Sequence, residues 1–229
     1  GEKRTTMTEA LARSFHSDGY AVARALAPAA MARNLLSVIH GSMVRDPKGL
    51  RKFELAEPRV NEKVGYEFYG PRLPSVMTFH WGLTNLASEI AGRPLLPSFS
   101  FFRVYMASDR LLVHTDRPSC EYALSLSLGY SEGIVWPLEL GEKRYDFAEI
   151  ADRPKEETFG EDAYRTVMLG PGDGLFYRGV NLRHGRMQPN PNRWSAHLFL
   201  FWVDSEGAFK DLAFDRMAFN ETVDFPPPR

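Results

Sequence analysis

Two side chains that commonly bind metal ions stand two residues apart near the middle of the chain, in His114-Thr115-Asp116. The surrounding run, residues 111–116, has the composition of a β-strand, and in an extended segment residues i and i+2 point to the same face. An imidazole nitrogen and a carboxylate oxygen can therefore converge on one ion. A capped turn or a core histidine explains an isolated His-x-Asp pair equally well, so the assignment depends on further residues.

A second histidine must come from elsewhere in the chain, and we expect His184, which follows a strand and turn over residues 175–181. Two histidines and one carboxylate that leave positions open on the opposite side form the facial triad of non-haem Fe(II) oxygenases. His197 is the rival ligand. Because it lies within the apolar run Ala196–Val203, we expect it to face the core or the substrate.

A possible receptor for a carboxylate follows nine residues after His184, where Arg193 and Ser195 again stand two apart. A guanidinium binds a carboxylate through two parallel hydrogen bonds and stays charged. A metal triad with a distant carboxylate receptor suits a chelating 2-oxo diacid, whose keto-acid end binds the metal and whose far carboxylate binds Arg193. Tyr105 and Arg103 share a strand face and could contact the same acid; a core tyrosine and an outward salt bridge are the competing explanations. For Tyr177 and Arg178, beside the distal histidine, a contact with the acid and a structural role are likewise both open.

Together these residues resemble the Fe(II)/2-oxoglutarate-dependent dioxygenases, whose sequences carry His-x-Asp, a distal His and Arg-x-Ser. The resemblance covers about residues 95–205 and is nearest to a bacterial branch of uncharacterised 2-oxoglutarate oxygenases. It rests on four longer stretches, which are Phe102–Tyr105, His114–Glu121, Pro171–Gly179 and Phe199–Asp204. The resemblance implies Fe(II) bound by His114, Asp116 and His184, and 2-oxoglutarate bound by Arg193 and Ser195 with Tyr105 and Arg103.

The same resemblance implies a hydroxylase that uses O2 on an unactivated C–H bond of a small molecule, amino acid or peptide and releases succinate and CO2. Family halogenases replace the carboxylate with a small residue, so Asp116 favours hydroxylation. Two alternatives stay open. One is a cupin-like metal enzyme that does not use 2-oxoglutarate, in which Arg193 and Ser195 have no role. The other is a non-catalytic barrel that binds a ligand or a protein partner.

The elements that must position these residues fall into two regions of one predicted domain, residues 1–229. Residues 7–94 are expected to form helical support, with helices at 7–17, 28–40 and 74–91. Residues 95–205 are expected to form an antiparallel double-stranded β-helix, or jelly roll, because short alternating segments are separated by turn residues. The charged stretch 141–165 is a possible lid over the metal.

Composition excludes several other classes of protein. Among 229 residues the formal net charge is -1, so no excess of positive charge points to nucleic acid. The longest apolar run is far too short to cross a membrane, and no secretory signal is visible, so a cytoplasmic location is expected. The single cysteine, Cys120, limits a metal site to nitrogen and oxygen ligands, which suit Fe(II) better than structural zinc. Substrate identity and oligomeric state are left open.

Overall fold

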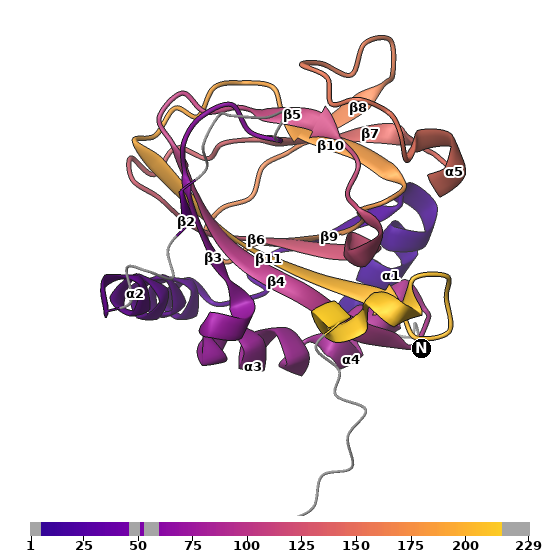
Figure 1. Ribbon diagram of the computed structural model, residues 1–229, viewed down its shortest axis with the longest axis horizontal. Helices are drawn as coiled ribbons and strands as arrows, with labels where there is room; N and C mark the ends of the chain where they lie inside the picture. The colour runs from indigo at the N-terminus through magenta and orange to yellow at the C-terminus, as the bar shows by residue number, and fades with distance from the viewer. Residues whose placement is uncertain (1–5, 46–50, 53–59, 217–229) are drawn as a thin grey trace, which may run out of the picture.

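Two antiparallel β-sheets face each other in the computed structural model, which describes residues 6–45, 51–52 and 60–216 (Figure 1). The larger sheet has seven strands in the order β1 (Tyr20–Ala23), β9 (Gly174–Arg178), β6 (Tyr122–Tyr130), β11 (Trp194–Asp204), β4 (Leu95–Met106), β3 (Tyr66–Tyr69) and β2 (Arg51–Lys52). The smaller has four, in the order β5 (Leu111–His114), β10 (Leu182–Arg186), β7 (Leu138–Arg144) and β8 (Tyr164–Val167). The chain is therefore mainly β, with helices.

The central strand β11 shows why the apolar run in the sequence is continuous: both of its faces are buried. Ala196, Leu198 and Leu200 pack with the helices, on the outer face of the larger sheet. Phe199 and Phe201 point the other way, into a second apolar cluster between the two sheets. The strand alternation thus builds two cores, and the second of them surrounds the space between the sheets.

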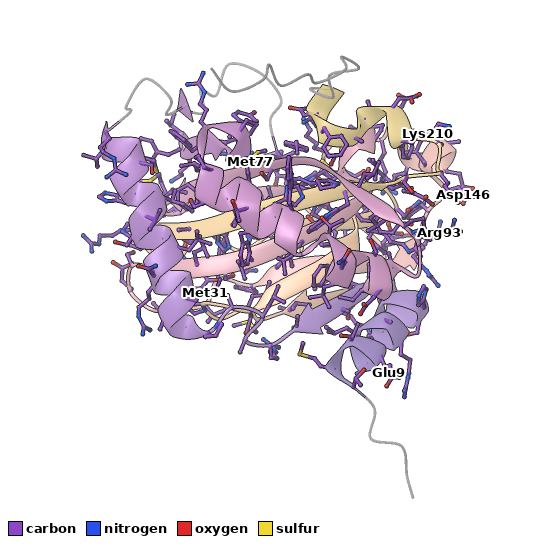
Figure 2. All side chains as sticks on the ribbon, turned by 90° about the horizontal axis from the view of Figure 1, so that it is seen from below. Glu9, Met31, Met77, Arg93, Asp146 and Lys210 are labelled. Carbon is purple, nitrogen blue, oxygen red and sulfur yellow. The ribbon has the colours of Figure 1, made fainter. Side chains whose placement is uncertain are left out.

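Four helices cover the outer face of the larger sheet. They are α1 (Met7–Asp18), α2 (Ala29–Arg45), α3 (Pro74–Gly82) and α4 (Thr84–Ala91). Figure 2 shows α2, marked by Met31, and α3, marked by Met77, lying across this sheet. The side chain of Thr6 and that of Glu9 cap the start of α1 reciprocally, and Gly19 ends it at φ 81°. No helix in the described ranges is both long and apolar enough to span a bilayer.

Two expectations about the elements were wrong in detail. The helix expected over 74–91 is divided into α3 and α4 at Leu83. The region 7–94 also supplies strands, since β1 pairs with β9 and β3 pairs with β4 at opposite sides of the larger sheet. The stretch 182–186, which we did not expect to be a strand, forms β10.

The stretch expected as a lid, 141–165, is partly built into the smaller sheet, since β7 runs to Arg144 and β8 begins at Tyr164. The segment between them contains the short helix α5 (Phe147–Ile150) and is bonded to β10. The guanidinium of Arg183 in β10 donates to the Phe159 carbonyl at 3.0 Å and to Asp162 Oδ2 at 2.6 Å. This segment is therefore attached directly beside His184.

Candidate metal centre and its cavity

The pairing of two short strands brings the three predicted metal ligands together. β5 and β10 are antiparallel neighbours, and His114 stands directly opposite His184 in their register. The Nε2 atom of His114 lies 3.7 Å from Asp116 Oδ1, and that of His184 lies 3.6 Å from the same oxygen. One ligand atom from each side chain lies within 4.8 Å of the other two. The three groups thus surround one point, at which a cation could bind.

Both histidines are held in the tautomer that a metal ligand needs. Each Nδ1–H donates to the backbone carbonyl two residues earlier, at 2.6 Å from His114 to Leu112 and at 3.0 Å from His184 to Leu182. Because the proton is on Nδ1, the lone pair of each Nε2 is free. This arrangement fixes the ring orientation in the absence of any metal.

The electrostatics of the cluster also suit a cation. Burial and the neighbouring charge of His184 lower the pKa of His114 to about 3. Burial opposes ionisation of His184 and Asp116, but their mutual attraction prevails, raising the pKa of His184 and lowering that of Asp116. Asp116 Oδ2 is buried without a hydrogen-bond partner among the described residues. A buried carboxylate oxygen left without a donor is costly, and a bound divalent cation would satisfy it.

Two glycines that our sequence reasoning missed make this convergence possible. A Cβ on Gly179 would lie 2.2 Å from the Cys120 carbonyl oxygen and 2.6 Å from Asp116 Oδ2. A Cβ on Gly185, within β10, would lie 2.8 Å from the Leu111 carbonyl oxygen of β5. Glycine inside or beside a strand marks such close approaches, so the sequence did carry a signal.

Substitution of Gly179 by alanine is expected to displace Asp116, because neither the Cys120 carbonyl nor the carboxylate can retreat within the buried cluster. We expect Mn(II) affinity to fall about tenfold or more, with a loss of unfolding free energy of about 1–3 kcal/mol from overpacking. Calorimetric titration with Mn(II) and chemical denaturation measure the two effects. Gly82→Ala, at a position where a Cβ meets nothing within 4 Å, is the steric control. Unchanged Mn(II) affinity in Gly179→Ala would contradict this account.

A cavity of about 380 Å³ between the sheets contains the three ligands. Arg186 lines it from β10, two residues beyond His184. Its side chain is fully buried, and Nη1 donates to the carbonyls of Trp136 and Pro137, the latter at 2.9 Å. Nη2 is buried without a hydrogen-bond partner, and no carboxylate in the described ranges forms an ion pair with this guanidinium. A buried cation without a counter-ion is costly and calls for an anion.

Glu139 of β7, which pairs with Gly185 of β10, forms no ion pair with Arg186. The Glu139 carboxylate accepts a hydrogen bond from the Met187 amide at 3.1 Å. Burial raises the pKa of Glu139, against the smaller lowering effect of the Arg186 charge. In the sequence Arg186 follows His184 by two residues, so the alternation of a strand, which places both side chains on one face, was the available signal.

Arg103 and Tyr105, which the sequence predicted near the cosubstrate, both line the cavity. The Glu67 carboxylate accepts from Arg103 Nη2 at 2.6 Å and from Nε at 3.1 Å. Arg103 Nη1 donates to the Tyr105 hydroxyl at 3.1 Å. Burial raises the pKa of Tyr105, which keeps this hydroxyl neutral. Because Glu67 neutralises Arg103, Arg186 is the fully buried guanidinium of this cavity with which no carboxylate of the described residues forms an ion pair.

The structure does not bring Arg193 to the metal ligands. Its side chain is 79% exposed, and its Nε donates to Glu132 Oε1 at 2.8 Å. We expected Arg193 and Ser195 to share one face of a strand. The strand β11 begins only at Trp194, so Arg193 belongs to the preceding turn. Ser195 does face inward, but its hydroxyl accepts from Asn190 Nδ2 at 3.2 Å and it does not line the cavity.

Three other residues considered from the sequence take separate places. His197 is buried and bonded to Ser127 Oγ at 3.4 Å; burial and the charges of Arg186 and Arg103 hold its pKa well below its usual value. It is therefore a neutral neighbour of Arg186 and no part of the metal cluster. Tyr177 packs edge-on to His184 at 4.8 Å between ring centroids. Arg178 instead stacks over Phe15, outside the cavity.

Comparison with known proteins finds similarity in structure alone. The sequence matches no protein-family model and no curated protein. Among solved structures, the non-heme α-ketoglutarate-dependent carbocyclase SnoK from nogalamycin biosynthesis superposes with a TM-score of 0.67 at 12% identity, covering 98% of each chain. The epimerase SnoN, solved with Fe3+, α-ketoglutarate and nogalamycin RO, gives a TM-score of 0.64 at 16% identity, covering 97% of this chain and 93% of its own.

A prolyl-4-hydroxylase from Pseudomonas putida gives a TM-score of 0.57 at 14% identity, covering 85% of this chain and 98% of its own. These three proteins differ in the reaction that their names describe, and two of them are described as α-ketoglutarate (2-oxoglutarate) proteins. At such low identity the likeness concerns architecture. The chain therefore has the fold of the non-heme 2-oxoglutarate-dependent oxygenases.

Proposed function

We propose that this protein is an Fe(II)- and 2-oxoglutarate-dependent dioxygenase with a single-domain, double-stranded β-helix core. The observation that carries the proposal is the buried cluster of His114, Asp116 and His184, with one carboxylate oxygen lacking a partner. Two histidines and a carboxylate on one face are the donor set of the non-haem Fe(II) oxygenases. The structurally similar SnoN, which binds iron and α-ketoglutarate, supports the same cofactors here.

Within this proposal Arg186, in place of Arg193, receives the far carboxylate of 2-oxoglutarate. Arg186 lines the same cavity as the ligands, and its Nη2 is buried without a partner. A charge-assisted pair with a carboxylate would satisfy both the unused donor and the uncompensated charge. The exposed Arg193 already pairs with Glu132 on the surface. A buried Arg186 also weighs against a cupin-like enzyme without 2-oxoglutarate, in which this charge has no purpose.

When bound, Fe(II) would supply the activation of O2 that side chains cannot perform. The protein's own groups orient and enclose the reactants. His114 and His184 present Nε2 toward the metal because backbone carbonyls hold Nδ1. Tyr177 stays protonated, since burial and the Asp116 carboxylate raise its pKa well above the usual value. Its ring packs edge-on against His184.

We further propose hydroxylation of a C–H bond in a small molecule as the reaction. The cavity volume of about 380 Å³ is near the lower end of ordinary ligand pockets, which span roughly 300–1,000 Å³. Cosubstrate and substrate must share this space, which favours a compact substrate over a folded protein. The similar structures include a carbocyclase and an epimerase, so other outcomes on the same oxidative site are the second candidate.

Succinate release tests the proposal. Protein reconstituted with Fe(II) under exclusion of air, then given 2-oxoglutarate and O2, is expected to form succinate slowly without a substrate and faster with one. Chelation of the iron before O2 is added is expected to stop succinate formation, and re-addition of Fe(II) to restore it. Protein that binds stoichiometric Fe(II) but neither binds nor consumes 2-oxoglutarate would contradict the proposal and favour a cupin-like activity.

A further inference from the structure

The metal ligands divide the cavity into two ends with different chemistry. In the pairing of β5 with β10, Arg186 stands opposite Leu111, at the start of β5. Asp116 and Arg117 follow the other end of that strand. The facing strand β4 runs between the same two ends. Its Tyr105 contacts Trp136, whose ring packs against the Arg186 guanidinium. Its Phe99 packs against the Arg117 guanidinium. If Arg186 binds the cosubstrate, the end near Arg117 is left for the substrate.

Four phenylalanine rings form a wall that runs from this second end to Phe101, over which the Arg103 guanidinium lies at 4.8 Å. Phe99 and Phe101 come from β4, Phe199 and Phe201 from the neighbouring β11, and all four line the cavity. Their rings are nearly parallel, with centroids 4.7 Å apart for Phe99 and Phe201 and 4.9 Å apart for Phe101 and Phe199. We call these residues the phenylalanine wall. Such a surface binds apolar, and above all aromatic, bodies.

A positive charge stands at the edge of the phenylalanine wall. The guanidinium of Arg117 lies 4.2 Å from the centroid of Phe99, and the side chain lines the cavity. No carboxylate in the described part of the chain forms an ion pair with it. Glu67, the acidic side chain that lines the cavity besides Asp116, is bonded to Arg103. This end therefore offers an aromatic surface beside a guanidinium whose hydrogen-bonding fork suits a carboxylate.

Arg117 is also held in a way that favours recognition. Stacking on Phe99 orients the guanidinium, which also interacts with the Cys120 thiol, so less freedom is lost when an anion binds. Its position next to Asp116 in the chain means that an acid bound there would lie close to the metal ligands. The bound molecule would then present its apolar body between the phenylalanine wall and the reactive centre.

We infer that the substrate is a small carboxylic acid with an aromatic or similar ring-shaped apolar body, its carboxylate bound by Arg117 and its ring by the phenylalanine wall. The inference rests on the proposed function, because it takes the Arg186 end to be filled by 2-oxoglutarate. It narrows the substrate class from any small molecule or peptide to anionic ring compounds.

Direct binding tests the inference without turnover. The protein is loaded with Mn(II) and saturating 2-oxoglutarate without O2, and titrated by calorimetry with 2-naphthoate, the neutral 2-naphthamide and the polar ring acid pyroglutamate. We expect 2-naphthoate to bind at least about tenfold more tightly than either comparator, since one retains the ring and the other the charge. Equal affinity for the amide, or for pyroglutamate, would overturn the inference.

Variants locate the two contacts. Arg117→Gln is expected to reduce the preference for naphthoate over the amide to about twofold or less, and Arg117→Lys to keep part of it. Arg165→Gln, an exposed arginine paired with Glu142, is the matched control and is expected to keep the full preference. A preference that survives in Arg117→Gln would overturn the assignment. Binding of 2-oxoglutarate is measured first: its absence in the wild type contradicts the proposed function, whereas normal 2-oxoglutarate binding without naphthoate selectivity contradicts only this inference.

Discussion

Replacing Asp116 with alanine is expected to abolish tight binding of divalent metal. The change removes the one carboxylate ligand of the cluster and leaves two neutral imidazoles. Their Nε2 atoms then face an empty space where the carboxylate stood. Loss of an outer hydrogen-bond partner of a ligand already costs about 10–100-fold in affinity, so loss of a ligand should cost at least about 100-fold. Calorimetric titration with Mn(II) and the visible spectrum of added Co(II) measure it, and succinate formation should fall to background.

The metal-free fold should not suffer in the same way. Asp116 carries a buried oxygen without a partner, so its removal relieves an electrostatic cost, which offsets the loss of its attraction to His184. We expect the unfolding free energy of metal-free Asp116→Ala to be close to that of the wild type. Asp152→Ala, which removes an exposed carboxylate, is the matched control and should bind Mn(II) normally. Wild-type Mn(II) affinity in Asp116→Ala would show that the cluster is not the metal centre.

Replacing Arg186 with glutamine is expected to weaken 2-oxoglutarate binding by at least about thirtyfold. Losing one partner of a buried charged pair costs about 2–5 kcal/mol, and 1.4 kcal/mol corresponds to a factor of ten. The free protein should bind Mn(II) as before, because Arg186 lies outside the ligand cluster. Calorimetry in the presence of Mn(II) measures the affinity. The rise in melting temperature that a saturating ligand gives should also shrink in Arg186→Gln.

The matched control for this prediction is Arg193→Gln, which tests our own sequence-based assignment. Arg193 is exposed and pairs with Glu132, so this variant should bind 2-oxoglutarate as the wild type does. The reverse result, with Arg193→Gln impaired and Arg186→Gln normal, would restore the assignment made from the Arg-x-Ser spacing.

The sequence alone identified the three candidate metal ligands and the strand that carries the first of them. His114 and Asp116 share a face by the twofold period of an extended chain, and this local rule needs no knowledge of the rest of the protein. The apolar run Ala196–Val203 lies within β11, and the structure shows that both faces of this strand are buried.

Only the tertiary structure decided which arginine faces the metal. Arg193 and Arg186 are both close to His184 in sequence. The alternation of side chains along a strand predicts the face of either arginine only if a strand includes that residue. β10 includes Arg186, whereas β11 begins one residue after Arg193. Where a strand begins depends on hydrogen bonds to distant segments, here β5, β7, β4 and β6. The buried charge of Arg186 arises in the same way, because burial is a property of the packed sheets, which no local pattern reports.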